Sequence, residues 1–310
     1  MMKSFVRDVI STEKNEKKLR KDKRMRACFF TAALLSSSAI AVIVIFISMK
    51  GITPFLQEGV DFFSFLFGTT WRKDQGIYGV GFIIVNTLVS SFGALLLSFP
   101  LSVLTALFIT KIAPKKLSAM MTTVIELLAS IPSVVYGVFA SGTITLLVST
   151  LAAQFNLVTA GGSSLLAVIL LLAIMIFPTI TSLSITAIRA VDKDVELGSL
   201  ALGATRTQTN FKVVLTSAKS GIFAGAILGL GRAFGEATAV AMVAGNKMFG
   251  PTFNLFDTTR TLTTTMLSGL KETTGLDYDI RFSAGLVLMA VILLSNLILN
   301  LVKKKVGNMK

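Results

Sequence analysis

Three charged residues lie inside long apolar segments of this sequence, and they are the side chains best placed to do chemistry: Glu126, Arg232 and Glu236. A charge at the centre of a membrane helix costs about 2.5–3.5 kcal/mol on insertion scales, so each one needs a reason. Arg232 and Glu236 are four residues apart and can pair along one helix face. Each of the three is predicted to be either a charged point on a solute pathway or part of an electrostatic contact that holds helices together. Spacing assigns Glu126 no partner, so for this residue we favour the structural role.

Glycines precede the Arg232 and Glu236 pair at the same spacing of four: Gly221, Gly225 and Gly229. At 100° per residue, the five positions fall within an arc of about 80°. Glycines in such a row let another helix approach closely. The pattern therefore predicts a narrow packing face that points into the bundle or toward a partner subunit, and not toward lipid.

Several kinds of chemistry are excluded by what the sequence lacks. It has no histidine and a single cysteine, Cys28, which removes disulfide frameworks and Cys/His zinc sites. No phosphate-cradling GxxxxGK[ST], HExxH or GxSxG motif is present. The segment GLGRAFG at 229–235 looks like a dinucleotide loop, but no strand precedes it. We therefore expect that this chain is not an enzyme and that it binds no metal or cofactor.

The elements that must position these residues are membrane helices. Hydrophobic residues make up 53% of the 310 residues, charged residues only 15%, and the mean hydropathy is +0.77. Apolar runs of about 20 or more residues recur along the chain, and each can cross about 30 Å of hydrocarbon. Inside the hydrocarbon, backbone groups must be satisfied within their own helix. We predict an all-α integral membrane bundle with spans at 27–49, 80–110, 117–149, 164–188, 220–246 and 282–302.

The basic residues predict the topology. Of the 30 Lys and Arg residues, 22 fall on the side of the two termini and 7 on the other. By the positive-inside bias, both termini and the loop after the fourth span are cytoplasmic. This distribution also explains the net charge of +14 without nucleic-acid binding. The predicted parts are a basic tail, an uncleaved anchor helix, a membrane domain and a second tail, at 1–26, 27–49, 76–302 and 303–310.

The cytoplasmic loop at 190–218 is longer than a plain connection between helices, which more often takes about 2–8 residues. Apolar and small residues at helical spacing are followed by Gly203 and then by a second apolar run. This pattern predicts two short helices with a glycine turn at the membrane surface. A structured loop of this size indicates a docking site for a partner.

Four segments resemble those of a known family. They are SLALGAT at 199–205, ELLASIPSVVYG at 126–137, FPTITSLSITAIRAV at 177–191 and GLGRAFGEATAVAMVAGN at 229–246. Together they are similar to ABC importer permeases of the phosphate-specific, PstC type, over the chain from about residue 76 onward. The loop departs from the family pattern at Leu197 and Thr216.

The resemblance implies a type I importer-like bundle and a role for each matched segment. It places Arg232, Glu236 and Glu126 on the substrate pathway. Arg232 suits an oxyanion, because its planar guanidinium carries a permanent charge and five donors. Glu236 would balance the charge of Arg232 until phosphate competes for the guanidinium. The implied ATPase-coupling residues are Glu196, Ser199, Leu200, Ala201, Gly203, Ala204 and Thr205.

The resemblance also implies partners in a prokaryotic inner or plasma membrane. They are a PstA-type permease subunit, two PstB-type ATPase subunits that use ATP and Mg, and an extracytoplasmic PstS-type phosphate-binding protein. Membrane lipid surrounds the spans. Two alternatives stay open: a permease of the same superfamily for another oxyanion, and an ion-coupled secondary transporter.

The outer loop at 258–275 is rich in threonine and places Leu262, Met266 and Leu270 four residues apart. This spacing predicts a short amphipathic helix. It would serve either as an interfacial cap on the bundle or as a docking surface for the binding protein.

Overall fold

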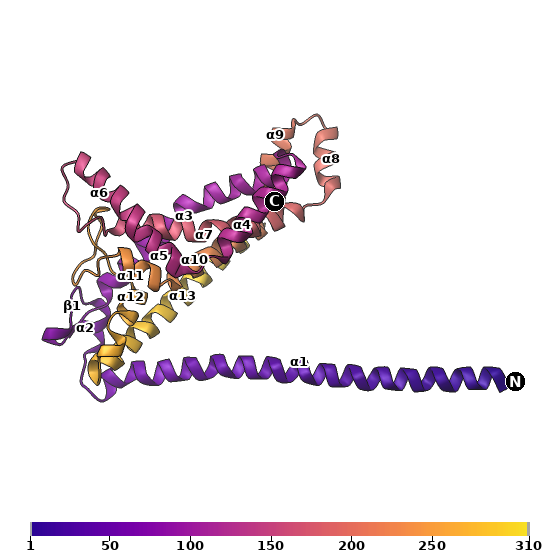
Figure 1. The fold of residues 1–310 in the computed structure, drawn as a ribbon, viewed down its shortest axis with the longest axis horizontal. Helices are drawn as coiled ribbons and strands as arrows, with labels where there is room; N and C mark the ends of the chain where they lie inside the picture. Colours follow the sequence, from indigo (N-terminus) through magenta and orange to yellow (C-terminus); the bar gives the residue numbers. More distant parts are fainter. Residues whose placement is uncertain (1, 309–310) are drawn as a thin grey trace. The chain divides into compact units, whose positions relative to one another are not determined.

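The computed structural model describes the backbone of residues 2–308 and the side chains of residues 21–304 (Figure 1). The chain forms two compact units, residues 1–50 and residues 51–310. The first unit is helical and belongs to α1 (Met2–Leu56), whose last residues enter the second unit. α1 is continuous, so no helix boundary separates the predicted tail from the predicted anchor.

The second unit is almost entirely helical. Its α-helices are α2 (Phe62–Phe67), α3 (Gly81–Leu107), α4 (Lys115–Ser130), α5 (Ser133–Phe139), α6 (Thr145–Gln154), α7 (Leu165–Arg189), α8 (Lys193–Ala201), α9 (Arg206–Gln208), α10 (Leu215–Gly235), α11 (Thr238–Val243), α12 (Leu262–Leu267) and α13 (Leu276–Asn308). Three π-helical turns directly follow α3, α5 and α9, at Phe108–Ile112, Ala140–Ile144 and Thr209–Val214, and the last two lead directly into α6 and α10. Short 3-10 helices cover Lys73–Gln75 and Leu270–Glu272.

Six helical stretches of the described residues are long and apolar enough to cross a membrane, which confirms the predicted fold class. They are Lys21–Leu56, Gly81–Ile112, Ser133–Gln154, Leu165–Arg189, Arg206–Gly235 and Leu276–Lys304. Within the second unit, α7 packs against both α3 and α10 (Figure 1) and supplies the largest share of the central apolar core. α8 and α9 lie at one end of this unit, and α2, β1 and α12 lie at the other.

The third predicted span, at 117–149, is wrong as one continuous helix. α4 ends at Ser130, Ile131 adopts extended backbone with ψ 128°, and α5 begins after Pro132. Proline cannot donate a backbone hydrogen bond and biases the preceding residue toward extended conformations, so the helix breaks there. The Tyr136 hydroxyl donates to the Leu128 carbonyl oxygen at 2.8 Å and satisfies an acceptor near the break.

The segment between α1 and α3 forms a small hairpin that sequence periodicity does not predict. β1 (Trp71–Arg72) pairs antiparallel with β2 (Ile77–Tyr78), and Trp71 lies opposite Tyr78. Both aromatic rings are buried in an apolar cluster with Phe65, Leu262 and Ile280. The cluster joins the hairpin to α12 and to the beginning of α13.

The expected amphipathic helix over 258–275 is shorter than predicted and packs inward. α12 ends at Leu267, because Gly269 adopts a left-handed conformation with φ +72°. Leu262 is fully buried, and three successive threonines, 263–265, are at most 6% exposed. A capping box joins Thr261 and Thr264, and the hydroxyls of Thr263 and Thr265 donate to the Glu236 and Thr261 carbonyl oxygens. The threonine run is therefore part of the packed structure of this loop.

Candidate functional site

The glycine face of α10 packs directly against α7, as its spacing predicts. A Cβ at Gly221 would lie 2.5 Å from the Ala187 Cβ, and one at Gly229 would lie 2.7 Å from the Ile180 Cγ1. A Cβ at Gly225 would lie 3.4 Å from the Ile180 carbonyl oxygen. The absence of side chains at these positions sets how closely the two helices approach.

Gly221→Ala is therefore expected to lower the thermal stability of the purified protein by several degrees. The added methyl group must displace Ala187 or separate α7 from α10, and overpacking of this kind costs about 1–3 kcal/mol. Gly231→Ala is the matched control on the same helix, because no atom outside its own turns of α10 lies within 4 Å of its Cβ position. Thermal unfolding of both variants measures the difference. Equal melting temperatures would contradict the close contact.

Arg232 lies one turn beyond the glycine face, near the end of α10. Its Nη1 donates to the Thr179 Oγ1 at 3.0 Å. Among the side chains that the structure describes, no carboxylate lies within ion-pair distance of the guanidinium. Arg232 and Thr179 line a hollow of about 720 Å³ between α7, α10 and α13. A cation without a counter-charge in an apolar span is a candidate site for an anion.

Glu236 does not pair with Arg232, so this prediction is wrong. α10 ends at Gly235, and Glu236 has extended backbone with ψ 118°, so the one-turn spacing of a continuous helix is lost. The Glu236 Oε1 instead accepts from the Ala239 backbone N–H at 3.0 Å, at the beginning of α11. The Glu236 carbonyl oxygen accepts from the Thr263 hydroxyl at 2.8 Å. Glu236 thus shapes the break between the two helices.

Glu126 lies on α4 and outside the apolar helix that follows it. Its side chain is exposed, as are those of Val124 and Leu127, whereas Ile125 is buried. No hydrogen bond or ion pair joins Glu126 to the rest of the described chain. The structure therefore does not bring Glu126 together with Arg232.

The loop between α7 and α10 has the predicted form of two short helices with a glycine turn. The Asp192 carboxylate caps α8, and Thr205 forms a capping box with Gln208 on α9. Gly203 lies between these helices with φ +84°, a conformation that side chains with a Cβ rarely adopt. The Ser199 and Thr209 hydroxyls are 3.0 Å apart and hold the two arms together.

An ion pair fixes this loop to the bundle, and several apolar side chains of the loop are exposed. Glu196 on α8 pairs with Lys111, at the end of the helix that begins with α3. The side chains of Leu197 and Leu202 are 61% and 91% exposed. Of the other predicted coupling residues, Ala201 is exposed, whereas Leu200 and Ala204 are half-buried. We call the exposed side chains of 195, 197, 201 and 202 the loop tip.

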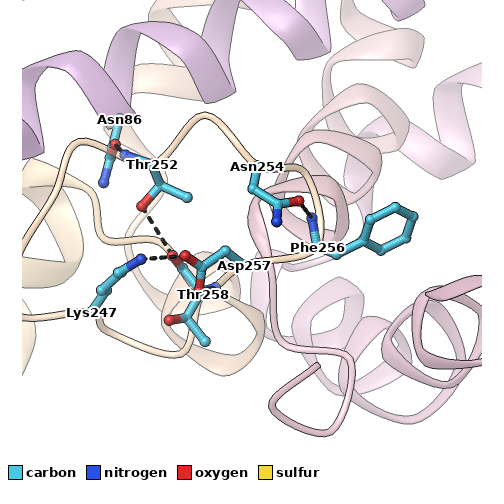
Figure 2. Close-up of polar contacts among 7 residues, drawn as sticks. All are labelled: Asn86, Lys247, Thr252, Asn254, Phe256, Asp257 and Thr258. Atoms are coloured by element: carbon cyan, nitrogen blue, oxygen red, sulfur yellow. Dashed lines mark hydrogen bonds and ion pairs between the residues drawn. The ribbon is translucent and has the colours of Figure 1, made fainter. Parts of the chain in front are cut away.

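Sequence reasoning missed a group of polar contacts in the outer loop, which Figure 2 shows. Lys247 pairs with the Asp257 carboxylate. The Asn86 Oδ1 of α3 accepts from the Thr252 backbone N–H at 2.8 Å, and the Thr252 hydroxyl donates to the Thr258 carbonyl oxygen at 3.1 Å. These contacts fasten the 247–258 segment to the beginning of α3. The sequence signal that could have predicted these contacts is Asn86, a polar residue within an apolar span.

Two buried arginines were also missed. The Arg260 side chain is 6% exposed; its Nε donates to the Thr265 Oγ1 at 3.0 Å, and its guanidinium lies 5.7 Å from the Trp71 ring centroid. Burial, with a smaller contribution from Arg281, lowers the pKa of Arg260 to about 10, so the group stays charged at neutral pH. Arg281 donates to the Thr265 and Ser268 carbonyl oxygens. Both cations therefore organise α12.

The arrangement of these helices can be compared with known proteins. Residues 98–308 match the family described as binding-protein-dependent transport system inner membrane component. The chain belongs to this family. It is a multi-pass inner-membrane permease subunit of an ABC importer, a transport component and not an enzyme.

Individual relatives of this permease agree with the family. A probable ABC transporter permease, YqgH of Bacillus subtilis, is 39% identical over 86% of each chain. The phosphate transport system permease protein PstC of Pasteurella multocida is 33% identical over 79% of this chain and 82% of its own. A chain of a bacterial alginate ABC transporter, crystallised with an alginate-pentasaccharide-bound periplasmic protein, has a TM-score of 0.63. That match covers 91% of this chain and 96% of the other at 20% identity, and it supports the fold alone.

Proposed function

We propose that this permease carries phosphate and is of the PstC type. The observation that carries the proposal is Arg232, which lacks a carboxylate partner among the described side chains and lines a hollow between membrane helices. It lies in the segment GLGRAFGE, on which the resemblance to phosphate permeases rests. The identity of 33% to a PstC protein supports the same solute.

The geometry suits transient binding of an oxyanion. The Arg232 guanidinium makes one hydrogen bond to the neutral Thr179 hydroxyl. Phosphate would offer two charged oxygens to the guanidinium fork, and charge-assisted bonds are about twice as strong as neutral ones. Phosphate therefore competes for Arg232 without first breaking an ion pair. Glu236 would affect the anion only indirectly. It lies at the break between α10 and α11, just beyond Arg232, and its carboxylate accepts a hydrogen bond from the first turn of α11.

The partners follow from this assignment. A PstA-type permease would complete the pathway, and the exposed face of α4 around Glu126 is our candidate for that contact. Two PstB-type ATPase subunits, which consume ATP and Mg, would dock on the loop tip, and a PstS-type protein would deliver phosphate to the outer face. Both termini would then lie in the cytoplasm. ATP-driven movement of 192–216 would expose Arg232 alternately to each side.

Competition for uptake tests the choice of solute. Cells that have this importer as their route for phosphate are given radiolabelled phosphate with excess unlabelled sulfate or molybdate. We expect unlabelled phosphate to abolish the signal and the other two anions to leave it unchanged. Competition by sulfate or molybdate would favour a permease for another oxyanion.

A further inference from the structure

The hollow beside Arg232 continues along α13, where the sequence gives no charged residue within the predicted span. Its lining includes Asn296, Asn300 and Lys303 of α13, together with Arg232 and Thr179. The three α13 residues are four and three positions apart. At 100° per residue they share one face within an arc of about 60° and cover about 10 Å of the helix.

The direction of the helices orders these residues. α7 and α13 run from the α12 end of the second unit toward the α8 end, and α10 runs the opposite way (Figure 1). Arg232, Thr179 and Asn296 therefore belong to the part of the hollow nearer α12, and Lys303 to the part nearer α8. A polar row leads from the Arg232 guanidinium toward the end of the bundle that carries the coupling loop.

Asn296 shows that this row is not satisfied within the chain. Its Oδ1 is buried and accepts no hydrogen bond from the described residues. An unpaired amide oxygen in such a place is costly, so an asparagine there needs a partner such as water or a solute. The opposite side of α13 is unlike this face, because Leu294, Leu297 and Leu301 are 57–59% exposed and apolar.

We propose that Asn296, Asn300 and Lys303 form the inner part of the anion pathway that begins at Arg232. The amide groups of Asn296 and Asn300 can donate to an oxyanion without adding charge, so the anion passes them without being held. Lys303 restores a positive charge where the pathway leaves the apolar region. The proposal rests on the proposed function for Arg232, but it concerns the route that water and the anion take between Arg232 and the α8 end of the bundle.

Thiol labelling of the assembled importer tests this pathway. Cys28 is the only cysteine of this chain, so Cys28→Ser removes its native thiol, and labelling is measured on this chain after the subunits are separated. Single cysteines then replace Asn296, Asn300 or Leu294, and a small membrane-impermeant sulfonate reagent is applied from the cytoplasmic side. Leu294 is the matched control, because it is exposed in this chain and lies about 160° around the helix from Asn296.

We expect Asn300→Cys and Asn296→Cys to react at least tenfold faster than Leu294→Cys, and added phosphate to slow them. Rates at both asparagine positions no faster than at Leu294 would overturn the proposal and would mean that a subunit or lipid covers this face. If one of the two asparagine variants does not assemble, the rate at the other asparagine position is compared with the rate at Leu294. The rates do not depend on which oxyanion is carried, so failure of phosphate as the solute would appear separately, in the competition experiment.

Discussion

Replacing Arg232 by glutamine is expected to reduce phosphate uptake by about 10- to 100-fold in an importer that still assembles. Hydrogen bonds to charged groups contribute about 1.5–3 kcal/mol, and each 1.4 kcal/mol is a tenfold change. Glutamine keeps a donor for Thr179 but removes the charge and the fork. Initial rates of radiolabelled phosphate uptake measure the loss, and ATP hydrolysis by the same preparation shows that the subunits remain coupled.

Two further variants show whether the charge of Arg232 or its hydrogen bond to Thr179 matters more. Arg232→Lys keeps the charge without the planar fork, so we expect an intermediate rate. Thr179→Val removes the neutral partner and leaves the guanidinium, so uptake should change by no more than a few fold. Full uptake by Arg232→Gln, with normal assembly, would show that Arg232 does not contact the anion.

Leu202→Asp is expected to separate the permease from its ATPase subunits. Leu202 is 91% exposed at the loop tip, and an aspartate there would have to be buried without a partner in the apolar contact that we propose. Co-purification of the ATPase subunits should fall at least tenfold, and ATP-dependent uptake should fall with it. Gly203→Val should act in the same direction, because φ +84° is strained for a β-branched residue.

Val158→Asp is the matched control for Leu202→Asp. Val158 is 97% exposed in the connection between α6 and α7, away from the coupling loop. We expect ATPase subunits to co-purify with this variant as they do with the native chain. If Leu202→Asp retains bound and active ATPase subunits, the docking surface lies elsewhere on the permease.

Hydropathy and charge were sufficient for the fold class and for the six membrane helices. Two of the predicted spans, 117–149 and 220–246, contain a break, and the two breaks have different physical reasons. The break at Pro132 has a local cause, because proline lacks a donor, and kinked helices are common enough that the sequence did not distinguish a kink from a break. The break at Glu236 has no proline, and the apolar pattern continues past it to residue 246.

The geometry at Glu236 depends on contacts between distant segments. Its carbonyl oxygen is satisfied by Thr263, 27 residues later, and no spacing within the span reveals that bond. The same limit explains why the predicted pairing of Arg232 with Glu236 was wrong. A spacing of four implies contact only where the helix continues between the two residues.

Polar residues inside or beside the membrane were only partly predicted. The charges at 126, 232 and 236 stand out against apolar neighbours, whereas Asn86 and Asn296 are hidden in windows whose average hydropathy is high. Arg260 lies in the predicted outer loop and Arg281 just before the last predicted span, yet both are at least 94% buried. Their burial follows from packing against Trp71 and α12, which no periodicity reports.

Accumulation of anions by the reconstituted importer tests the central claim most directly. Proteoliposomes would contain this chain, its second permease subunit and the ATPase subunits, with the binding protein on the outer side and ATP on the other. We predict that radiolabelled phosphate accumulates only with ATP and the binding protein, and that radiolabelled sulfate does not accumulate. Accumulation of sulfate in place of phosphate, or phosphate entry through this chain without ATP, would contradict the account.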